Sequence, residues 1–509
     1  MATRYVSQTA TNGYSIGVDS GVGTSKSSPW LTVTYALLNA SAGDTIVIND
    51  GIYTDAGGFF SVTKTLTINS ETDYGAILRG SNATRALNLN AAAGTVVTLG
   101  KVVVDGNNVS ASCITVTSIA GQQHVWNFNK TKFRNPVNYG WNTNNTNEVI
   151  NASDVIFEGC KWGFVGYSLS AGAYNIDGCI FNYTGTAQCG VTDLNATSTG
   201  VTAWVRRVVA NLTSSSASVC FVVSLSNIQS TIEDCDLNLS GTCSGGLIAL
   251  RQIAAVIADM PVIRRNKGVM AATGASTYLV LIGSDTAGAN DNSINYPIVY
   301  QNNFVGNNTA ATVHGILLAN MKGGVVTDNV VSKAVIPFIS KLQSEKSYWV
   351  NNRSYEITGA NGHLRSKGST SPVFVGNIAD VKTGFASLMV LADKDPAIPT
   401  YTSNAAYIGN YLTSEDVVVT QAITVETSSS ANFRHNNYYL PRGVSGTPWS
   451  DGASTYATLA LWGAAKDVYY KSSAPALINR FFYKDIYLPI IQAMSVGKAT
   501  VMAMLRAVF

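Results

Sequence analysis

The sequence predicts an all-β fold, a parallel β-solenoid, from two observations. Short β-branched and apolar runs recur between residues 54 and 441, and small polar turns that end in Asn or Cys follow them. The same stretch lacks the recurrent amphipathic helices that an α/β fold would need. A loose repeat with variable insertions is typical of stacked coils. A β-propeller or β-sandwich also fits the strand content, but the recurring Asn and Cys positions favour the solenoid.

Residues 1–55 are predicted to form an N-terminal cap. An extended run is followed by a Gly- and Ser-rich loop, and Pro29 is expected at the start of a short helix, because its fixed φ and missing N–H suit the first turn. Ala36, Leu37 and Ala40 then fall on one helical face together with Val33. Residues 45–48 form a β-branched run, and residues 50–51 predict a tight turn.

Residues 56–447 are predicted to form the solenoid, of roughly a dozen coils. Coils stack about 4.8 Å apart, so equivalent side chains lie above one another, and Asn side chains at one bend can form a ladder of amides. Asn also tolerates the left-handed backbone conformation that a tight bend needs. We expect one such stack from Asn303, Asn329, Asn352, Asn377 and Asn410. The polar turns end at residues 135, 160, 179, 211, 235, 266, 303, 329, 352, 377, 410 and 437.

Residues 448–509 differ in character. A helix is predicted from about residue 455 to 467, where it would cover the last coil and its unpaired strand edges. Residues 475–509 carry an apolar helical stripe, which predicts burial against other subunits or partners. Closed symmetry is the commonest form of such assembly.

Composition narrows the function. Of 509 residues, 46% are hydrophobic and only 12% charged, and the net charge of +3 is too small to indicate nucleic acid. Seven cysteines without a C-x-x-C motif predict buried thiols and no zinc site. The four histidines show no metal spacing, so we expect neither metal nor cofactor. No apolar run reaches the length of a membrane span, and the N-terminus lacks a secretory h-region.

Three carboxylates are candidate catalytic residues. Glu158 and Asp177 precede neighbouring polar turns, and Asp234 precedes a later one. Stacking would bring neighbouring members within about 5–10 Å, the separation that a glycosidase needs. The alternative is that these residues are turn formers, which Asp, Glu and Gly commonly are.

Tyr and Trp side chains are candidate sugar-binding residues, because an exposed ring offers an apolar face and a polar edge. The candidates cluster around the Glu158–Asp177 region, and the alternative is that half or more of them belong to the core. They are Trp126, Trp141, Trp162, Tyr167, Tyr174 and Tyr183.

Both ends of the chain resemble a known family. The N-terminal pattern is similar to the cap of right-handed parallel β-helix proteins of the pectate-lyase-like type, and the C-terminal pattern to the helix that closes their last coil. The first resemblance rests on Pro29, Trp30, Ala36, Gly43, Asp44, Thr45, Gly51 and Tyr53, and the second on Trp449, Asp451, Leu459, Trp462 and Asp467.

With its apolar tail and no signal peptide, the chain also resembles bacteriophage tailspikes and related virion proteins. That resemblance implies a virion location, a homotrimer, contacts with other virion proteins and binding of host-surface polysaccharide. The alternatives are a polysaccharide depolymerase, either a lyase or a glycoside hydrolase, and a surface adhesin or decoration protein without catalysis. No catalytic motif separates them.

Overall fold

The structure is a computed structural model, and the chain divides into two compact units. Unit 1 comprises residues 1–258 and 266–274, and unit 2 comprises residues 259–265 and 275–509. Each unit is described by itself. The described residues are 1–90, 92, 94–117, 123–143, 147–251, 258–283, 294–307, 313–342, 344–357, 362–381, 390–393, 403–414, 423–426, 429–434, 437–439, 449–451 and 454–466.

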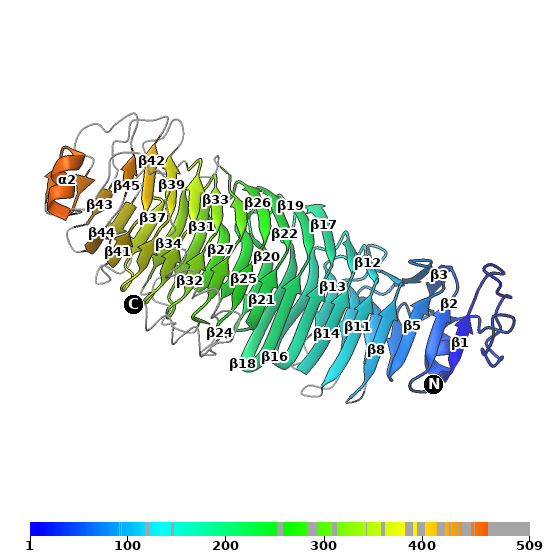
Figure 1. Cartoon of the computed structure of the whole chain (residues 1–509). Helices are drawn as coiled ribbons and strands as arrows, with labels where there is room; N and C mark the ends of the chain where they lie inside the picture. Colours follow the sequence, from blue (N-terminus) through cyan, green and yellow to red (C-terminus); the bar gives the residue numbers. More distant parts are fainter. Residues whose placement is uncertain are drawn as a thin grey trace. The chain divides into compact units, whose positions relative to one another are not determined.

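Unit 1 is a parallel β-solenoid with three strand faces, which we call A, B and C in the order in which the chain visits them in each coil. Figure 1 shows the face B strands from β8 to β18 side by side. Face A holds β4 (Phe60–Val62), β7 (Arg85–Leu89), β10 (Ser112–Val116), β13 (Tyr139–Thr143), β20 (Val219–Ser226) and β23 (Ser244–Arg251). Face B holds β1 (Thr3–Val6), β2 (Thr45–Ile48), β5 (Leu66–Ser70), β8 (Val96–Gly100), β11 (His124–Asn129), β14 (Asn147–Ser153) and β21 (Gln229–Glu233). Face C holds β3 (Gly51–Thr54), β6 (Ala76–Arg79), β9 (Val103–Asp105), β12 (Lys132–Arg134), β15 (Ile156–Glu158), β17 (Ile180–Gly185), β19 (Val209–Ser214), β22 (Asp236–Gly241) and β26 (Lys267–Ala272).

Two long strands join faces A and B of unit 1. They are β16 (Trp162–Asp177) and β18 (Gly190–Arg206), and each runs along face A, bends, and continues along face B. Their register slips on either side of Leu169, where the strand turns from one face to the next. Side chains therefore point to solvent from both faces of these coils.

Unit 2 repeats the same three-face coil. Face A holds β27 (Thr277–Gly283), β31 (Val313–Ala319), β34 (Ile336–Lys341), β37 (Leu364–Lys367), β40 (Val390–Asp393), β43 (Ile423–Val425) and β46 (Trp449–Ser450). Face B holds β25 (Val262–Arg264), β29 (Ile298–Tyr300), β32 (Val325–Thr327), β35 (Tyr348–Val350), β38 (Val373–Val375), β41 (Asn404–Ile408) and β44 (Ser430–Arg434). Face C holds β30 (Asn303–Val305), β33 (Val330–Ser332), β36 (Arg353–Tyr355), β39 (Ile378–Val381), β42 (Tyr411–Ser414) and β45 (Asn437–Tyr439). Two further short strands are β24 (Ala258–Asp259) and β28 (Ile294–Asn295), and β47 (Thr455–Tyr456) pairs antiparallel with β46.

The predicted amide ladder is present in unit 2, at the corner between faces B and C. Each Asn side chain donates to the Oδ1 of the next, from Asn302 to Asn410, at 2.8 to 3.0 Å. The residue before each one has a positive φ, from +52° at Asn351 to +62° at Gly376. Asn303, which we expected in the stack, is exposed and begins β30, so the prediction was one residue out.

Other predicted positions belong elsewhere in the coil. Asn135 and Cys160 follow face C strands, at a different corner, and Asn211 points to solvent from face C. Cys179 and Cys235 do occupy the B–C corner, where they replace Asn as small buried side chains. The fold class is thus an all-β parallel β-solenoid, as predicted, with only α1 and α2 as helices among the described residues.

Helices lie near both ends of the described chain. α1 (Val33–Asn39) begins after Thr32, whose hydroxyl accepts from the Tyr35 N–H at 3.2 Å, so Pro29 precedes the helix instead of opening it. α2 (Leu459–Lys466) falls within the predicted C-terminal helix. The Trp462 side chain of α2 is buried at the end of a row of stacked aromatic side chains, and its ring centroid lies 5.1 Å from that of Phe433. The apolar tail, residues 475–509, lies outside the described residues.

Candidate functional site

The structure separates the predicted sugar-binding aromatics into two groups. Trp126, Trp141 and Tyr174 have no exposed surface, and Tyr183 is 9% exposed. Inward strand positions place these four rings inside the solenoid of unit 1, where they cannot stack on an external sugar. The prediction is wrong for them, and the core alternative holds. Trp162 and Tyr167 remain as candidates.

Trp162 and Tyr167 lie on the face A part of β16, and Tyr139 lies on the neighbouring strand β13; we call these three residues the aromatic platform. Tyr139 and Trp162 are register partners on β13 and β16, and both are half-buried. The Trp162 ring extends over the following coil, because a Cβ at Gly190 would lie 2.4 Å from the ring. A glycine at this position is therefore what lets the indole lie across the strand.

Tyr167 completes the platform with a fixed hydroxyl group. It is 42% exposed, and its O–H donates to Asp193 Oδ2 at 3.1 Å. Partial burial and the nearby Asp193 carboxylate raise the pKa of Tyr167, so the phenol stays protonated at neutral pH. Asp193 is partly exposed and keeps acceptor capacity for a sugar hydroxyl. The sequence contains no acidic residue other than Asp193 in the face A strands of unit 1.

The predicted catalytic acids do not meet at one place. Glu158 ends the face C strand β15, with its side chain 47% exposed and 2.9 Å from Lys132 Nζ. Asp177 ends the face B part of β16, and its register partners are Ser153 and Arg206, not Glu158. The prediction that Glu158 and Asp177 hold equivalent places in neighbouring coils is therefore wrong.

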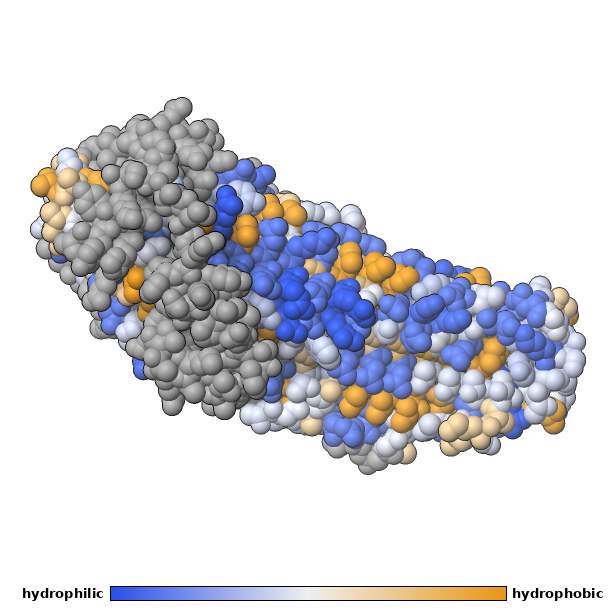
Figure 2. All heavy atoms as spheres, viewed as in Figure 1, coloured by the Kyte–Doolittle hydropathy of each residue, from blue (hydrophilic) through white to orange (hydrophobic). Residues whose placement is uncertain are grey.

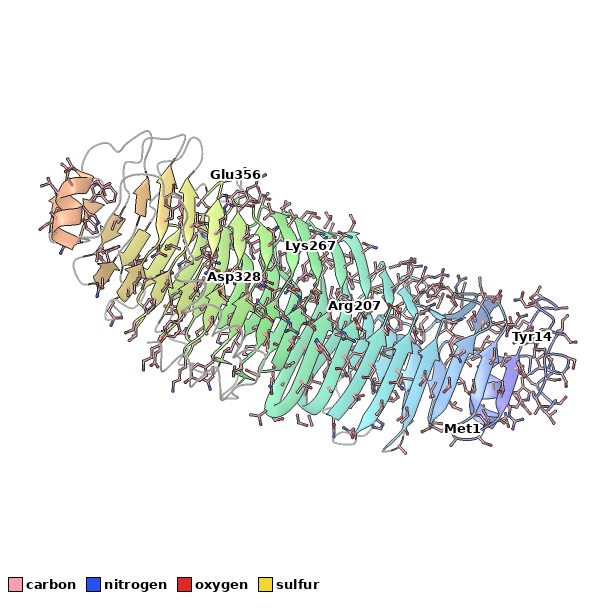
Figure 3. The ribbon with its side chains drawn as sticks, in the orientation of Figure 1. Met1, Tyr14, Arg207, Lys267, Asp328 and Glu356 are labelled. Carbon is pink, nitrogen blue, oxygen red and sulfur yellow. The ribbon has the colours of Figure 1, made fainter. Side chains whose placement is uncertain are left out.

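Asp177 instead anchors a group that we call the charged corner: Asp177, Trp204, Arg206, Arg207 and Glu233. Arg207 donates to both Asp177 oxygens, at 2.7 and 2.6 Å, and Arg206 Nη2 lies 2.7 Å from Oδ2. Figure 2 shows strongly hydrophilic side chains gathered on this part of unit 1, and Figure 3 labels Arg207 there.

Trp204 is the aromatic residue of the charged corner. It is 41% exposed, the Arg206 guanidinium lies 4.4 Å from its ring centroid, and its indole N–H donates to Glu233 Oε1 at 2.7 Å. Trp204 was not among the predicted sugar-binding residues; it lies in the part of β18 where buried and exposed residues alternate. Asp234, the third predicted acid, occupies the exposed left-handed position directly after Glu233, with φ +56°.

The chemistry of the charged corner favours fixed charge over proton transfer. Burial opposes ionisation of Asp177, but hydrogen bonds from Arg207 and Arg206 outweigh it and lower the pKa of the carboxyl group. Glu233 is almost fully buried and accepts the Trp204 indole N–H. A glycosidase needs one carboxyl group that stays protonated. Asp177 is not set up for that role.

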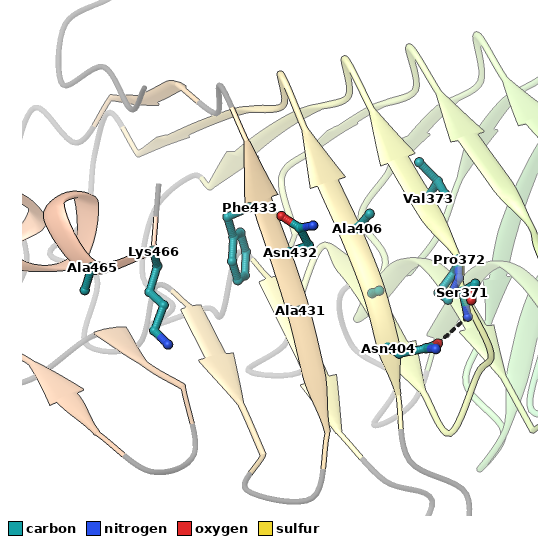
Figure 4. A pocket seen from close by; sticks show the side chains of 11 residues that line it. Ser371, Pro372, Val373, Asn404, Ala406, Ala431, Asn432, Phe433, Ala465 and Lys466 are labelled. Atoms are coloured by element: carbon teal, nitrogen blue, oxygen red, sulfur yellow. Dashed lines mark hydrogen bonds between the residues drawn. The ribbon is translucent and has the colours of Figure 1, made fainter. Parts of the chain in front are cut away.

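A hollow of about 530 Å³ lies in unit 2 beside α2 (Figure 4). Its polar groups are amides, a hydroxyl group and one ammonium group, and it has no carboxylate. The Lys466 ammonium is 2.5 Å from Asp451, and the Asn404 side chain accepts from the Ser371 N–H. The lining residues are Ser371, Pro372, Val373, Asn404, Ala405, Ala406, Ala431, Asn432, Phe433, Ala465 and Lys466. No acid–base pair lines this hollow, and no sequence pattern indicated the hollow.

Metal and membrane features are absent from the part of the chain that the structure describes. No three His, Cys, Asp or Glu side chains there converge as metal ligands. All seven cysteines are buried and unpaired, as predicted. No described helix is long and apolar enough to cross a lipid bilayer.

No family model and no curated protein matches the sequence. Solved structures similar to the chain include DFA-IIIase from Arthrobacter chlorophenolicus A6, at 10% identity and a TM-score of 0.35 over 86% of this chain and 89% of that one. A mannuronic acid specific polysaccharide family 6 lyase from human gut microbiota has 12% identity and a TM-score of 0.31, over 92% and 94% of the two chains. Pectate lyase Pel9A has 13% identity and a TM-score of 0.29, over 77% and 79%. Likeness at this level assigns no activity to the chain.

Proposed function

We propose that the chain binds polysaccharide, with the aromatic platform of unit 1 as its binding surface. The observation that carries the proposal is the geometry of Trp162, laid across Gly190, with the exposed Tyr167 further along the same strand. Rings held flat at a surface offer apolar area to the C–H face of a sugar. Asp193, which fixes the Tyr167 hydroxyl group, supplies an acceptor at the edge of the platform.

Depolymerisation is the competing proposal. The face A strands of unit 1 supply one carboxylate, Asp193, whereas hydrolysis at this surface would need a pair. The charged corner has two, but Arg207 and Arg206 lower the pKa of Asp177, and Glu233, which accepts the Trp204 indole N–H, is almost fully buried. These observations favour binding without cleavage. The virion location, the homotrimer and contacts with other virion proteins stay predictions from the sequence resemblance, because no described residue bears on them.

The experiment is native affinity electrophoresis of the full chain in gels that contain alginate, polygalacturonate, dextran, xylan or galactomannan. We expect retardation by at least one polymer, and no release of reducing ends when that polymer is incubated with the chain. Absence of retardation by all five would contradict the proposal. Release of reducing ends that Asp177→Asn or Asp193→Asn abolishes would favour the depolymerase.

A further inference from the structure

A second group of residues in unit 1 has the properties of a sugar site, on face B instead of face A. Three Asn side chains form a ladder there, from the half-buried Asn127 and Asn151 to the exposed Asn175. Asn151 donates to Asn127 Oδ1 at 2.9 Å, and Asn175 donates to Asn151 Oδ1 at 2.8 Å. The register continues from Asn175 to Trp204 on the next strand. The ladder therefore ends beside an indole.

The end of this ladder is an open hydrogen-bond acceptor. Asn175 is exposed, and its Oδ1 accepts no hydrogen bond from any described residue. Trp204 cannot donate a hydrogen bond to Asn175 Oδ1, because the only N–H of its side chain donates to Glu233 on the opposite side. Asn175 can thus accept a hydrogen bond from a ligand hydroxyl group that rests against the Trp204 ring.

Trp204 is held in place before any ligand arrives. Arg206 covers one face of the ring, and the hydrogen bond to Glu233 fixes its edge. The residue is nonetheless 41% exposed, so part of the side chain stays open to solvent. An aromatic side chain that is already ordered loses little conformational entropy on binding.

Arg207 supplies hydrogen-bond donors beside Asp177, directly after the end of the strand that holds Trp204. Its side chain is 62% exposed and is held by two hydrogen bonds to Asp177, which use the Nε and Nη2 groups. The guanidinium keeps further N–H donors for solvent or ligand. The acceptor Asn175 thus lies on one coil, and the Trp204 ring and the Arg207 donors lie on the next, about 4.8 Å along the axis.

From this arrangement we propose a second carbohydrate site, at Asn175, Trp204 and Arg207, that binds a pyranose ring of the same polysaccharide as the platform. The inference rests on the proposed function for the identity of the ligand, but on different residues and a different face. Two sites in one unit make binding of a long polymer stronger than binding of a short oligosaccharide, which can occupy only one site at a time.

The test compares the polymer that retards the chain with a short oligosaccharide prepared from it, by titration calorimetry. The variants are Trp204→Ala and Asn175→Ala, with Thr202→Ala, an exposed residue on the same strand, as the control. We expect Trp204→Ala to weaken polymer binding on the order of tenfold and Asn175→Ala by less, with Thr202→Ala unchanged. The double variant Trp162→Ala/Tyr167→Ala should leave residual oligosaccharide binding with half the stoichiometry.

The outcomes separate the two proposals. If Trp204→Ala and Asn175→Ala bind polymer and oligosaccharide like the wild type, the second site is refuted, while loss of binding in the platform variant would still support the proposed function. If the Trp162→Ala/Tyr167→Ala double variant binds normally and Trp204→Ala does not, the aromatic platform is refuted as a binding surface and the second carbohydrate site is supported. Circular dichroism of each variant verifies folding, and truncation of exposed side chains should leave it intact.

Discussion

Single buried amides hold successive coils of unit 2 together. Asn352 donates to Asn377 Oδ1 at 3.0 Å and to the Val326 carbonyl oxygen at 2.8 Å, while its own Oδ1 accepts from Asn329. The side chain has no exposed surface, so water cannot replace a lost partner. A neighbour left without its hydrogen bond then carries the full cost of desolvation.

The first prediction follows from this ladder. Asn352→Ala should lower the free energy of unfolding by about 1–3 kcal/mol, because Asn329 loses its acceptor. Asn303→Ala is the control, since Asn303 is exposed and outside the ladder, and it should change stability by less than about 0.5 kcal/mol. Urea unfolding of both variants measures the difference. Equal stabilities would show that the ladder does not carry this energy.

A buried histidine predicts a pH dependence. His363 in unit 2 has no exposed surface, and its Nδ1 lies 2.8 Å from Ser354 Oγ. Burial lowers the pKa of His363 from 6.5 to about 3. Below pH 6.5 the unfolded chain therefore binds a proton that the folded chain does not, so stability is complete above pH 6.5 and is lost as the pH falls towards 3.

The second prediction gives this effect a size. Between pH 7.5 and 5.0 the wild type should lose about 2 kcal/mol of stability more than His363→Gln does. Gln can keep a hydrogen bond to Ser354 and does not titrate. Urea unfolding at both pH values provides the measurement. Parallel losses in the two proteins would mean that His363 does not cause the pH dependence.

At the scale of elements, α2 covers the end of an aromatic row. Trp349, Phe374, Tyr407 and Phe433 stack with ring centroids 5.7, 5.0 and 5.1 Å apart, and Trp462 of α2 packs edge-on against the last ring. Without Trp462 the Phe433 ring would face solvent or a void. The short helix is thus part of the core of unit 2.

The third prediction tests that role. Trp462→Ala should destabilise unit 2 by about 3–5 kcal/mol, because a fully buried ring is removed. Leu461→Ala lies on the same helix but is 56% exposed, so it should have little effect. Differential scanning calorimetry compares the two variants. A Leu461→Ala loss as large as that of Trp462→Ala would contradict the assignment.

The sequence predicted the elements better than the site. β-Branched runs and repeated Asn residues indicate coils. Asn also suits the left-handed turn that follows face C, at Asn135, so the sequence does not distinguish this corner from the corner between faces B and C. Which aromatic side chains face outward depends on the register of each strand, since inward and outward positions alternate. Trp126 and Trp204 both follow a β-branched or small residue in the sequence, yet only the structure shows that one is buried and the other exposed.

At the scale of the molecule, unit 1 carries both proposed sugar sites, and each is made by residues from successive coils. No single turn of the solenoid contains a complete site. Stacking brings Tyr139 beside Trp162, and Asn175 beside Trp204. Function in this account therefore depends on the register of neighbouring coils.

Binding of polysaccharide by the aromatic platform is tested by the dissociation constant of the polymer for the Trp162→Ala/Tyr167→Ala double variant. Tyr355→Ala, a partly buried tyrosine in unit 2, serves as the control. The double variant should bind on the order of tenfold or more weakly than the wild type, while Tyr355→Ala should bind normally. A double variant that folds and binds with wild-type affinity would contradict the claim that the aromatic platform binds polysaccharide.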